Sequence, residues 1–74
     1  MISENDKIAQ IRFGENLKKL RIERGLSYRK MAYTCSVDNS KISKIEKGRV
    51  NITLNTMLQL AEALQIHPSE LLNY

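Results

Sequence analysis

The chain has 74 residues, a formal net charge of +4 and one cysteine. This length suits one small domain, and no apolar run approaches the ~20 residues of a membrane span. The first residues, M-I-S-E-N-D-K, lack the basic start and apolar block of a signal peptide. A lone cysteine forms neither an intrachain disulfide nor a structural zinc site. We therefore expect a cytoplasmic protein with one domain over residues 1–74, no metal and no cofactor.

The charge is unevenly distributed along the chain. Residues 12–49 hold eleven Lys and Arg against four Asp and Glu, whereas residues 50–74 hold two Glu and no Lys or Arg. This asymmetry suggests a polyanionic partner for the first part and a core or a partner surface for the second. Ordinary solubilising charge explains the pattern equally well at this point.

Three apolar residues at i, i+4 and i+7 predict a first helix over residues 8–24. They are Phe13, Leu17 and Leu20. Ser3 or Asn5 could cap an earlier turn, and we expect residues 1–7 to be frayed. Gly25 ends the helix, because a helix C-terminus favours a residue that is free to adopt a positive φ.

Two short helices follow. The first covers residues 28–35 after Ser27, and the next covers residues 39–47 after Asp38. Both preceding residues have the side-chain oxygen of an N-cap. Gly48 ends the third helix as Gly25 ends the first.

Thr53 caps a fourth predicted helix, over residues 54–65, which carries a broad apolar stripe. The stripe comprises Leu54, Met57, Leu58, Leu60, Ala61 and Leu64. His67 and Pro68 start a last short helix over residues 69–73, since proline suits the first turn of a helix. No stretch alternates with period two, so we expect a compact all-α fold of five helices.

Residues 27–48 have the dimensions of a helix-turn-helix, because two helices of eight or nine residues are joined by a short turn. Val37, Ile42 and Ile45 would hold the third helix against the core. The opposite face would present Asn39, Ser40, Ser43 and Lys44. An α-helix fits the major groove of DNA, where Asn, Ser and Lys side chains hydrogen-bond to base edges. Taken alone, this segment still favours a solvated face without a role in recognition.

The residues around this segment favour DNA. The N-terminus of the second helix would attract a phosphate, because its free N–H groups and its dipole are positive. Donors gather there in Ser27, Tyr28, Arg29 and Lys30. Lys47 and Arg49 would reach the DNA backbone on the other side, and such contacts fix register without reading sequence.

Three stretches carry a family resemblance: G-E-N-L-K-K-L-R-I-E-R-G-L-S-Y-R-K-M-A, S-V-D-N-S-K-I-S-K-I-E-K-G and T-L-N-T-M-L-Q-L-A-E-A-L-Q-I-H-P-S-E-L-L. In order and spacing they resemble the Xre family of helix-turn-helix proteins, the Cro and lambda-repressor type. The match covers residues 13–72. It implies a five-helix fold with the helix-turn-helix at helices two and three, and a dimer that represses transcription from a palindromic operator in double-stranded DNA.

The resemblance also implies roles by position. The base-reading positions are Asn39, Ser40, Ser43 and Lys44. The positions near phosphates are Ser27, Tyr28, Lys41, Lys47 and Arg49. Arg21 and Glu46 match a pair that ties the first helix to the third, and the alternative for Glu46 is a surface charge worth almost nothing.

Two positions depart from the family pattern. Tyr28 stands where the family often has Gln, so the contact there differs. Ser36 stands where it often has Gly. A left-handed Ser36 would cost about 1–2 kcal/mol, and the alternative is a turn of a different shape.

Other readings remain open at this stage. The chain could instead be the antitoxin of a toxin–antitoxin pair or a restriction–modification controller. We expect no enzyme, because the S-x-x-K pattern from Ser27 to Lys30 lacks the accompanying catalytic motifs. Cys35 is expected to be a small core residue, with redox sensing as the alternative. The C-terminal Leu71, Leu72 and Tyr74 either close the core or form a dimer seam.

Overall fold

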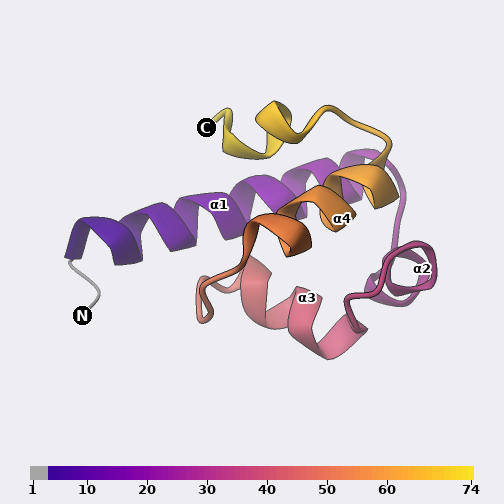
Figure 1. Ribbon diagram of the computed structural model, residues 1–74, viewed down its shortest axis with the longest axis horizontal. Helices are drawn as coiled ribbons and strands as arrows, with labels where there is room; N and C mark the ends of the chain where they lie inside the picture. The colour runs from indigo at the N-terminus through magenta and orange to yellow at the C-terminus, as the bar shows by residue number, and fades with distance from the viewer. Residues whose placement is uncertain (1–3) are drawn as a thin grey trace.

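The computed structural model describes residues 4–74, and this part of the chain contains helices and no strands (Figure 1). Its elements are α1 (Glu4–Glu23), α2 (Tyr28–Thr34), α3 (Asn39–Glu46), α4 (Leu54–Leu64) and a 3₁₀ helix, η1 (Pro68–Leu72). The long helix α1 runs along the molecule, and α3 and η1 lie on opposite sides of it (Figure 1). The fold is therefore all-α, as predicted.

The prediction of five α-helices is wrong in its last member, because residues 4–74 contain four α-helices and η1 is a 3₁₀ helix. Gln65 ends α4 by adopting a left-handed conformation with φ 56°. Only five residues of helix follow, and 3₁₀ geometry is common in such short pieces. The helix begins and ends one residue earlier than predicted, but Pro68 lies in its first turn as expected, and His67 Nδ1 accepts a hydrogen bond from the Ser69 amide at 3.1 Å.

The boundaries of the other helices differ slightly from the prediction. α1 begins at Glu4, well before residue 8, whereas α2, α3 and α4 each end one residue earlier than expected. Residues 4–7 belong to α1, and the rest of the segment predicted to be frayed, residues 1–3, lies outside the described residues.

Two glycines end helices as predicted. Gly25 has φ 67° after α1, and Gly48 has φ 71° after α3. Each lets the next amide donate back into the helix: Leu26 to the Arg21 carbonyl and Arg49 to the Lys44 carbonyl, both at 3.1 Å. These bonds satisfy carbonyls that a helix C-terminus otherwise leaves unpaired.

Ser36 needs no glycine-like conformation. Gln65 is the one non-glycine residue with a positive φ in the described part of the chain. The turn instead leaves α2 through Cys35 in an extended conformation, with φ −140°. The turn therefore has a different shape, which was the alternative to a left-handed Ser36, and Ser36 carries no left-handed strain.

The core lies between α1 and the other helices. Its buried side chains are Phe13, Leu17, Met31, Val37, Ile42, Ile45, Leu60, Ala61, Leu64 and Leu71. Cys35 is half-buried against this core, and its Sγ donates to the Met31 carbonyl at 3.3 Å. The broad stripe predicted for α4 is only partly correct, because Leu54 and Leu58 are exposed.

Candidate nucleic-acid interface

The helix α3 has one buried face and one open face. Ile42 and Ile45 are fully buried, and Val37, just before the helix, is also in the core. At 100° per residue, the opposite face carries Ser40, Lys44 and Lys47, all of which are exposed. Asn39 and half-buried Ser43 lie on one edge of this face, and Lys41 lies on the other. The four predicted base-reading residues therefore lie on one continuous polar side of α3.

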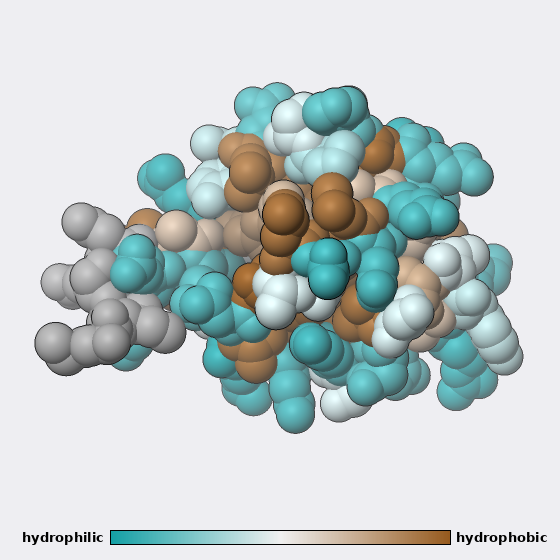
Figure 2. All heavy atoms as spheres, viewed as in Figure 1, coloured by the Kyte–Doolittle hydropathy of each residue, from teal (hydrophilic) through white to brown (hydrophobic). Residues whose placement is uncertain are grey.

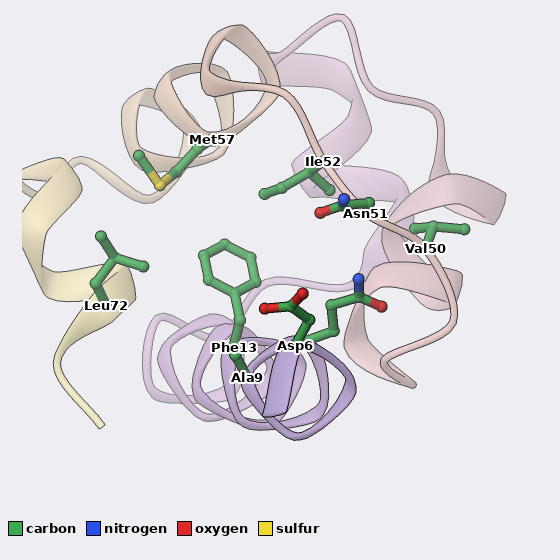
Figure 3. A pocket seen from close by; sticks show the side chains of 9 residues that line it. Asp6, Ala9, Phe13, Val50, Asn51, Ile52, Met57 and Leu72 are labelled. Carbon is green, nitrogen blue, oxygen red and sulfur yellow. The ribbon is translucent and has the colours of Figure 1, made fainter. Parts of the chain in front are cut away.

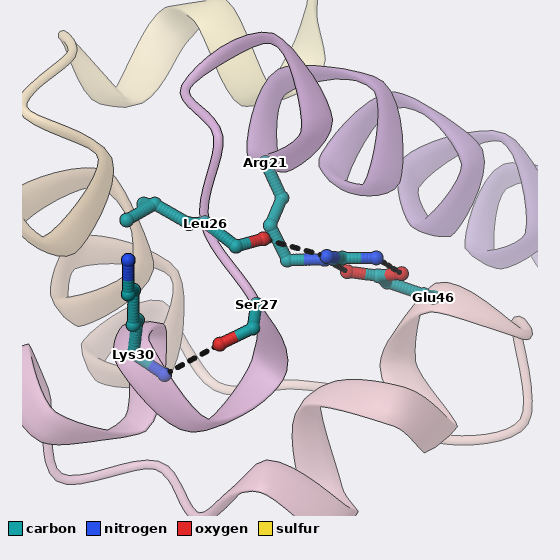
Figure 4. Close-up of polar contacts among 5 residues, drawn as sticks. All are labelled: Arg21, Leu26, Ser27, Lys30 and Glu46. Atoms are coloured by element: carbon teal, nitrogen blue, oxygen red, sulfur yellow. Dashed lines mark hydrogen bonds and ion pairs between the residues drawn. The ribbon is translucent and has the colours of Figure 1, made fainter.

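Both helices of the motif begin at the predicted caps. The Ser27 hydroxyl accepts a hydrogen bond from the Lys30 amide at 3.1 Å (Figure 4). The Asp38 carboxylate accepts one from the Lys41 amide at 2.8 Å. Such bonds satisfy amides that the first turn leaves free. They also engage the Asp38 carboxylate at the start of α3.

An ion pair connects α1 to the C-terminal end of α3 (Figure 4). Arg21 Nε donates to Glu46 Oε2 at 2.6 Å, and Nη2 donates to Oε1 at 3.2 Å. The two side chains are only 10% and 2% exposed. This is the bidentate geometry that makes arginine–carboxylate pairs strong. The pair implied by the family resemblance is therefore formed and buried, and the surface-charge alternative is excluded.

Two further contacts hold the same guanidinium. Arg21 Nη1 donates to the Leu26 carbonyl at 2.7 Å. The ring of Tyr28 lies under the guanidinium, with its centroid 4.3 Å from Cζ. The hydrogen bonding that Arg21 donates to the Glu46 carboxylate has the largest effect on the pKa of the guanidinium and raises it, against the opposing effect of burial. Arg21 thus links α1, the start of α2 and the end of α3.

The predicted phosphate contacts lie in two groups. Ser27, Tyr28, Arg29 and Lys30 stand at the first turn of α2, where all but half-buried Tyr28 are exposed. Lys41, Lys47 and Arg49 lie on or just beyond α3, and all three are exposed. The tyrosine at position 28, where the family often has Gln, has a structural role because its ring packs against Arg21.

Sequence reasoning missed two positioning residues in α1. The amide of buried Asn16 donates to the carbonyls of Glu70 and Leu71, at 2.8 and 3.0 Å, and ties η1 to α1. Gly14 lies where α1 and α3 meet: a Cβ built there would be 2.6 Å from the Glu46 carbonyl oxygen. A polar residue and a glycine among the apolar positions of a helix were the available signals.

The described residues contain neither a metal-holding group nor a membrane-spanning helix. No group of three or more His, Cys, Asp and Glu side chains is placed to hold a metal ion. No helix in this part of the chain is long and apolar enough to cross a bilayer.

The geometry defines a helix-turn-helix protein, and comparison with known proteins agrees. Residues 14–74 match the family model described as a helix-turn-helix domain. The chain therefore belongs to the helix-turn-helix family.

Among its relatives are controller proteins. Control protein C.MunI from a Mycoplasma species is 40% identical over 63 residues, which are 84% of this chain and 85% of the relative. The crystal structure of the restriction-modification controller C.AhdI from Aeromonas hydrophila has a TM-score of 0.81 at 39% identity, covering 84% of this chain and 94% of that one.

A second solved structure shares the fold at lower identity. The controller C.Esp1396I, solved as a tetramer in complex with its natural 35 base-pair operator, has a TM-score of 0.80 at 23% identity. The alignment covers 88% of this chain and 86% of the C.Esp1396I chain.

Proposed function

We propose that this protein is a sequence-specific regulator of transcription that binds double-stranded DNA as a dimer on a palindromic operator. The observation that carries the proposal is the two-sided character of α3. Ile42, Ile45 and Glu46 fix one side in the core, and the other side is an exposed row of hydrogen-bonding groups. Residues 27–48 form the DNA-binding unit of the domain.

The proposed base contacts come from the polar side of α3. Asn39 and Lys44 suit adenine and guanine edges respectively, because Asn pairs with adenine N6 and N7 and Lys donates to guanine O6 and N7. Ser40 and Ser43 supply short groups that donate or accept. The hydrogen bond that the Asp38 carboxylate accepts from the Lys41 amide supports this role, because a carboxylate engaged in this way repels phosphate less.

The proposed phosphate contacts position this helix on the DNA. The start of α2 offers its amides and the side chains of Ser27, Tyr28, Arg29 and Lys30 to one strand. Lys41, Lys47 and Arg49 lie at the edge and end of α3 and reach the other side of the groove. Eleven of the twelve Lys and Arg precede residue 50 but follow residue 11, so the charge is concentrated in the part of the chain that holds the motif.

The relatives narrow the biological role. C.MunI and C.AhdI are control proteins, and both are similar to this chain over most of their length. We therefore propose that the protein controls a restriction–modification system by acting at an operator, with repression among its outputs.

Selection of binding sites from random duplex DNA tests the proposal. We expect one enriched sequence with two inverted half-sites whose centres are about 34–36 Å apart, one helical turn. Recovery of unrelated sequences, or full affinity for a single half-site, would count against a dimeric reader of DNA sequence.

Lys44→Ala tests the reading of bases. On the selected operator we expect a loss of about 1–3 kcal/mol in binding free energy and a relaxed preference at one base pair. Lys19→Ala is the matched control, because it removes the same charge from α1, where Lys19 lies near the C-terminal Asn73 and Tyr74. A loss for Lys44→Ala that is the same on every sequence would remove this residue from the base contacts.

A further inference from the structure

Two of the hollows at the surface of the described residues differ in charge. The first, of about 390 Å³, lies between α1, α4 and η1, where Phe13, Met57 and Leu72 point into it (Figure 3). Its lining includes no Lys or Arg, and Asp6 contributes a carboxylate. Figure 2 shows apolar atoms gathered over α4 on this side of the molecule, whereas hydrophilic atoms predominate along the lower edge, where α3 lies. The first hollow therefore lacks the cations that supply most of the affinity of proteins for DNA.

The second hollow, of about 370 Å³, lies where α2 meets the start of α3, and we call it the α2–α3 hollow. Its lining combines exposed polar side chains with less exposed apolar ones. The former include Arg29, Tyr33 and Asn39, and the latter are Ala32, Cys35 and Val37. Asn39 is a proposed base contact and Arg29 a proposed phosphate contact. The α2–α3 hollow therefore adjoins the proposed DNA-binding surface, and Tyr33 is the residue of this group that has no proposed role.

Tyr33 does not pack into the core. Its side chain is 82% exposed, a larger fraction than that of any other exposed large apolar residue in the described part of the chain. Tyr28, in the same helix, is instead packed against the core. A tyrosine combines an apolar ring with a hydroxyl group at its tip, which suits a contact that is apolar at one end and polar at the other. Packing within the chain therefore does not account for the tyrosine at position 33.

The charge of α2 favours a DNA strand as the partner of Tyr33. Arg29 and Tyr33 are four residues apart, so they lie on the same side of the helix. The helix also carries Lys30 and contains no Asp or Glu. Arginine and tyrosine are both among the side chains that hydrogen-bond to phosphate oxygens in protein–DNA complexes. A ring beside a guanidinium can therefore contact the sugar of a nucleotide and donate to its phosphate.

The two edges of the α2–α3 hollow are held in place by local hydrogen bonds. Cys35 Sγ donates to the Met31 carbonyl at 3.3 Å, which fixes the end of α2. The Asp38 carboxylate also lines the hollow, and it accepts a hydrogen bond from the Lys41 amide at 2.8 Å. This bond fixes the start of α3 and engages a carboxylate that would otherwise repel phosphate. The hollow is therefore preorganised, which reduces the entropic cost of binding.

We propose that Tyr33 is a further DNA-contacting residue, and that Tyr33 and Arg29 together hold one nucleotide of the operator beside the base pair that Asn39 contacts. The deoxyribose packs on the tyrosine ring, and the phosphate accepts hydrogen bonds from the phenol and the guanidinium. This inference rests on the proposed function and extends its interface along α2, beyond the first turn. Because these contacts go to the DNA backbone, they add affinity and fix register without reading a base.

Fluorescence anisotropy of the full chain with its selected operator tests the inference. Tyr33→Ala should weaken binding roughly 10-fold, because it removes a hydrogen bond to a charged group and the packing of a ring. Tyr33→Phe keeps the ring and should lose less. Since the phenol is uncharged, neither variant should change the slope of log affinity against log salt, whereas Arg29→Ala should reduce it by about one. Ile22→Ala is the control, because it shortens an exposed side chain of α1 that does not line the α2–α3 hollow.

Operators that carry a single uncharged methylphosphonate locate the contact. Beside the base pair at which Asn39→Ala relaxes the preference, one such replacement should weaken the wild type roughly 10-fold but Arg29→Ala less than about 3-fold, because the variant has already lost that contact. Arg12→Ala should respond as the wild type does, since Arg12 lies on α1 near Asn73 and Tyr74. Wild-type affinity for Tyr33→Ala, or the absence of any phosphate with this non-additive response, overturns the inference.

Lys44→Ala separates this inference from the function on which it rests. If Lys44→Ala relaxes the preference at one base pair while Tyr33→Ala binds as the wild type does, the function stands and Tyr33 is not a DNA contact. A protein partner is then the alternative for the surface around Tyr33. If the wild type selects no DNA sequence, the proposed function fails and this inference fails with it. Because Tyr33 is exposed, its variants should keep the melting temperature of the wild type, so a loss of affinity does not reflect unfolding.

Discussion

Removal of the Glu46 carboxylate should be among the most damaging single changes in this protein. In Glu46→Ala, Arg21 loses the bonds of 2.6 and 3.2 Å that it makes to Glu46 and keeps one hydrogen bond, to the Leu26 carbonyl at 2.7 Å. Each lost bond is charge-assisted and worth about 1.5–3 kcal/mol. Since Arg21 stays charged and buried, we expect a loss of about 3–5 kcal/mol in the free energy of unfolding.

This loss is large for so small a domain. At about 0.05–0.15 kcal/mol per residue, a chain of this size is stable by roughly 4–11 kcal/mol. Urea unfolding followed by circular dichroism at 222 nm measures the change. Glu46→Gln, which keeps the shape and one acceptor oxygen, should lose less and remain measurable if Glu46→Ala does not fold.

Two controls make the reasoning refutable. Glu62→Ala removes an exposed carboxylate from α4 and should change stability by less than about 0.5 kcal/mol. The double variant Arg21→Met with Glu46→Leu should be more stable than Glu46→Ala, because neither side chain leaves a buried charge unpaired. A loss below about 1 kcal/mol for Glu46→Ala would mean that the pair behaves as a surface salt bridge.

Three further changes test other parts of the molecule. Lys47→Ala should weaken binding equally on all DNA sequences and reduce the slope of log affinity against log salt by about one, as measured by fluorescence anisotropy; an unchanged slope would remove Lys47 from the phosphate contacts. Gly14→Ala should lower the free energy of unfolding, measured in urea, by about 1–3 kcal/mol, because the added methyl group meets the backbone of α3 at Glu46. The control Lys18→Ala, at an exposed position of the same helix, should leave stability unchanged. Equal stability of the two variants would contradict the close contact. Gln65→Gly should raise the melting temperature, since glycine adopts the left-handed conformation at φ 56° without the cost of about 1 kcal/mol borne by glutamine; a lower melting temperature would show that the Gln65 side chain contributes more than its backbone costs.

The local features of this protein could be predicted from its sequence alone. The caps at Ser27 and Asp38 were predictable, because each side chain bonds to an amide three residues away. Gly25 and Gly48 end helices for an equally local reason, their freedom to adopt positive φ. The polar row on α3 follows from helical spacing once Ile42 and Ile45 are known to face inward.

The contact between Arg21 and Glu46 was only partly predictable from the sequence. The residues are 25 positions apart, so no local rule joins them, and it was the family resemblance that favoured the contact. The structure added what the resemblance could not supply: burial on both sides, the bond to the Leu26 carbonyl and the ring of Tyr28 beneath the guanidinium.

Which apolar residues are covered depends on how the helices pack together. Leu60 is buried and Leu54 is exposed, although both belong to the apolar stripe of α4, and Leu71 closes the core while the adjacent Leu72 does not. Periodicity identifies an apolar stripe, but the width of the stripe that is buried depends on the elements that pack against it. The buried amide of Asn16 and the left-handed Gln65 have the same origin, because both depend on where the C-terminal segment lies against α1 and α4.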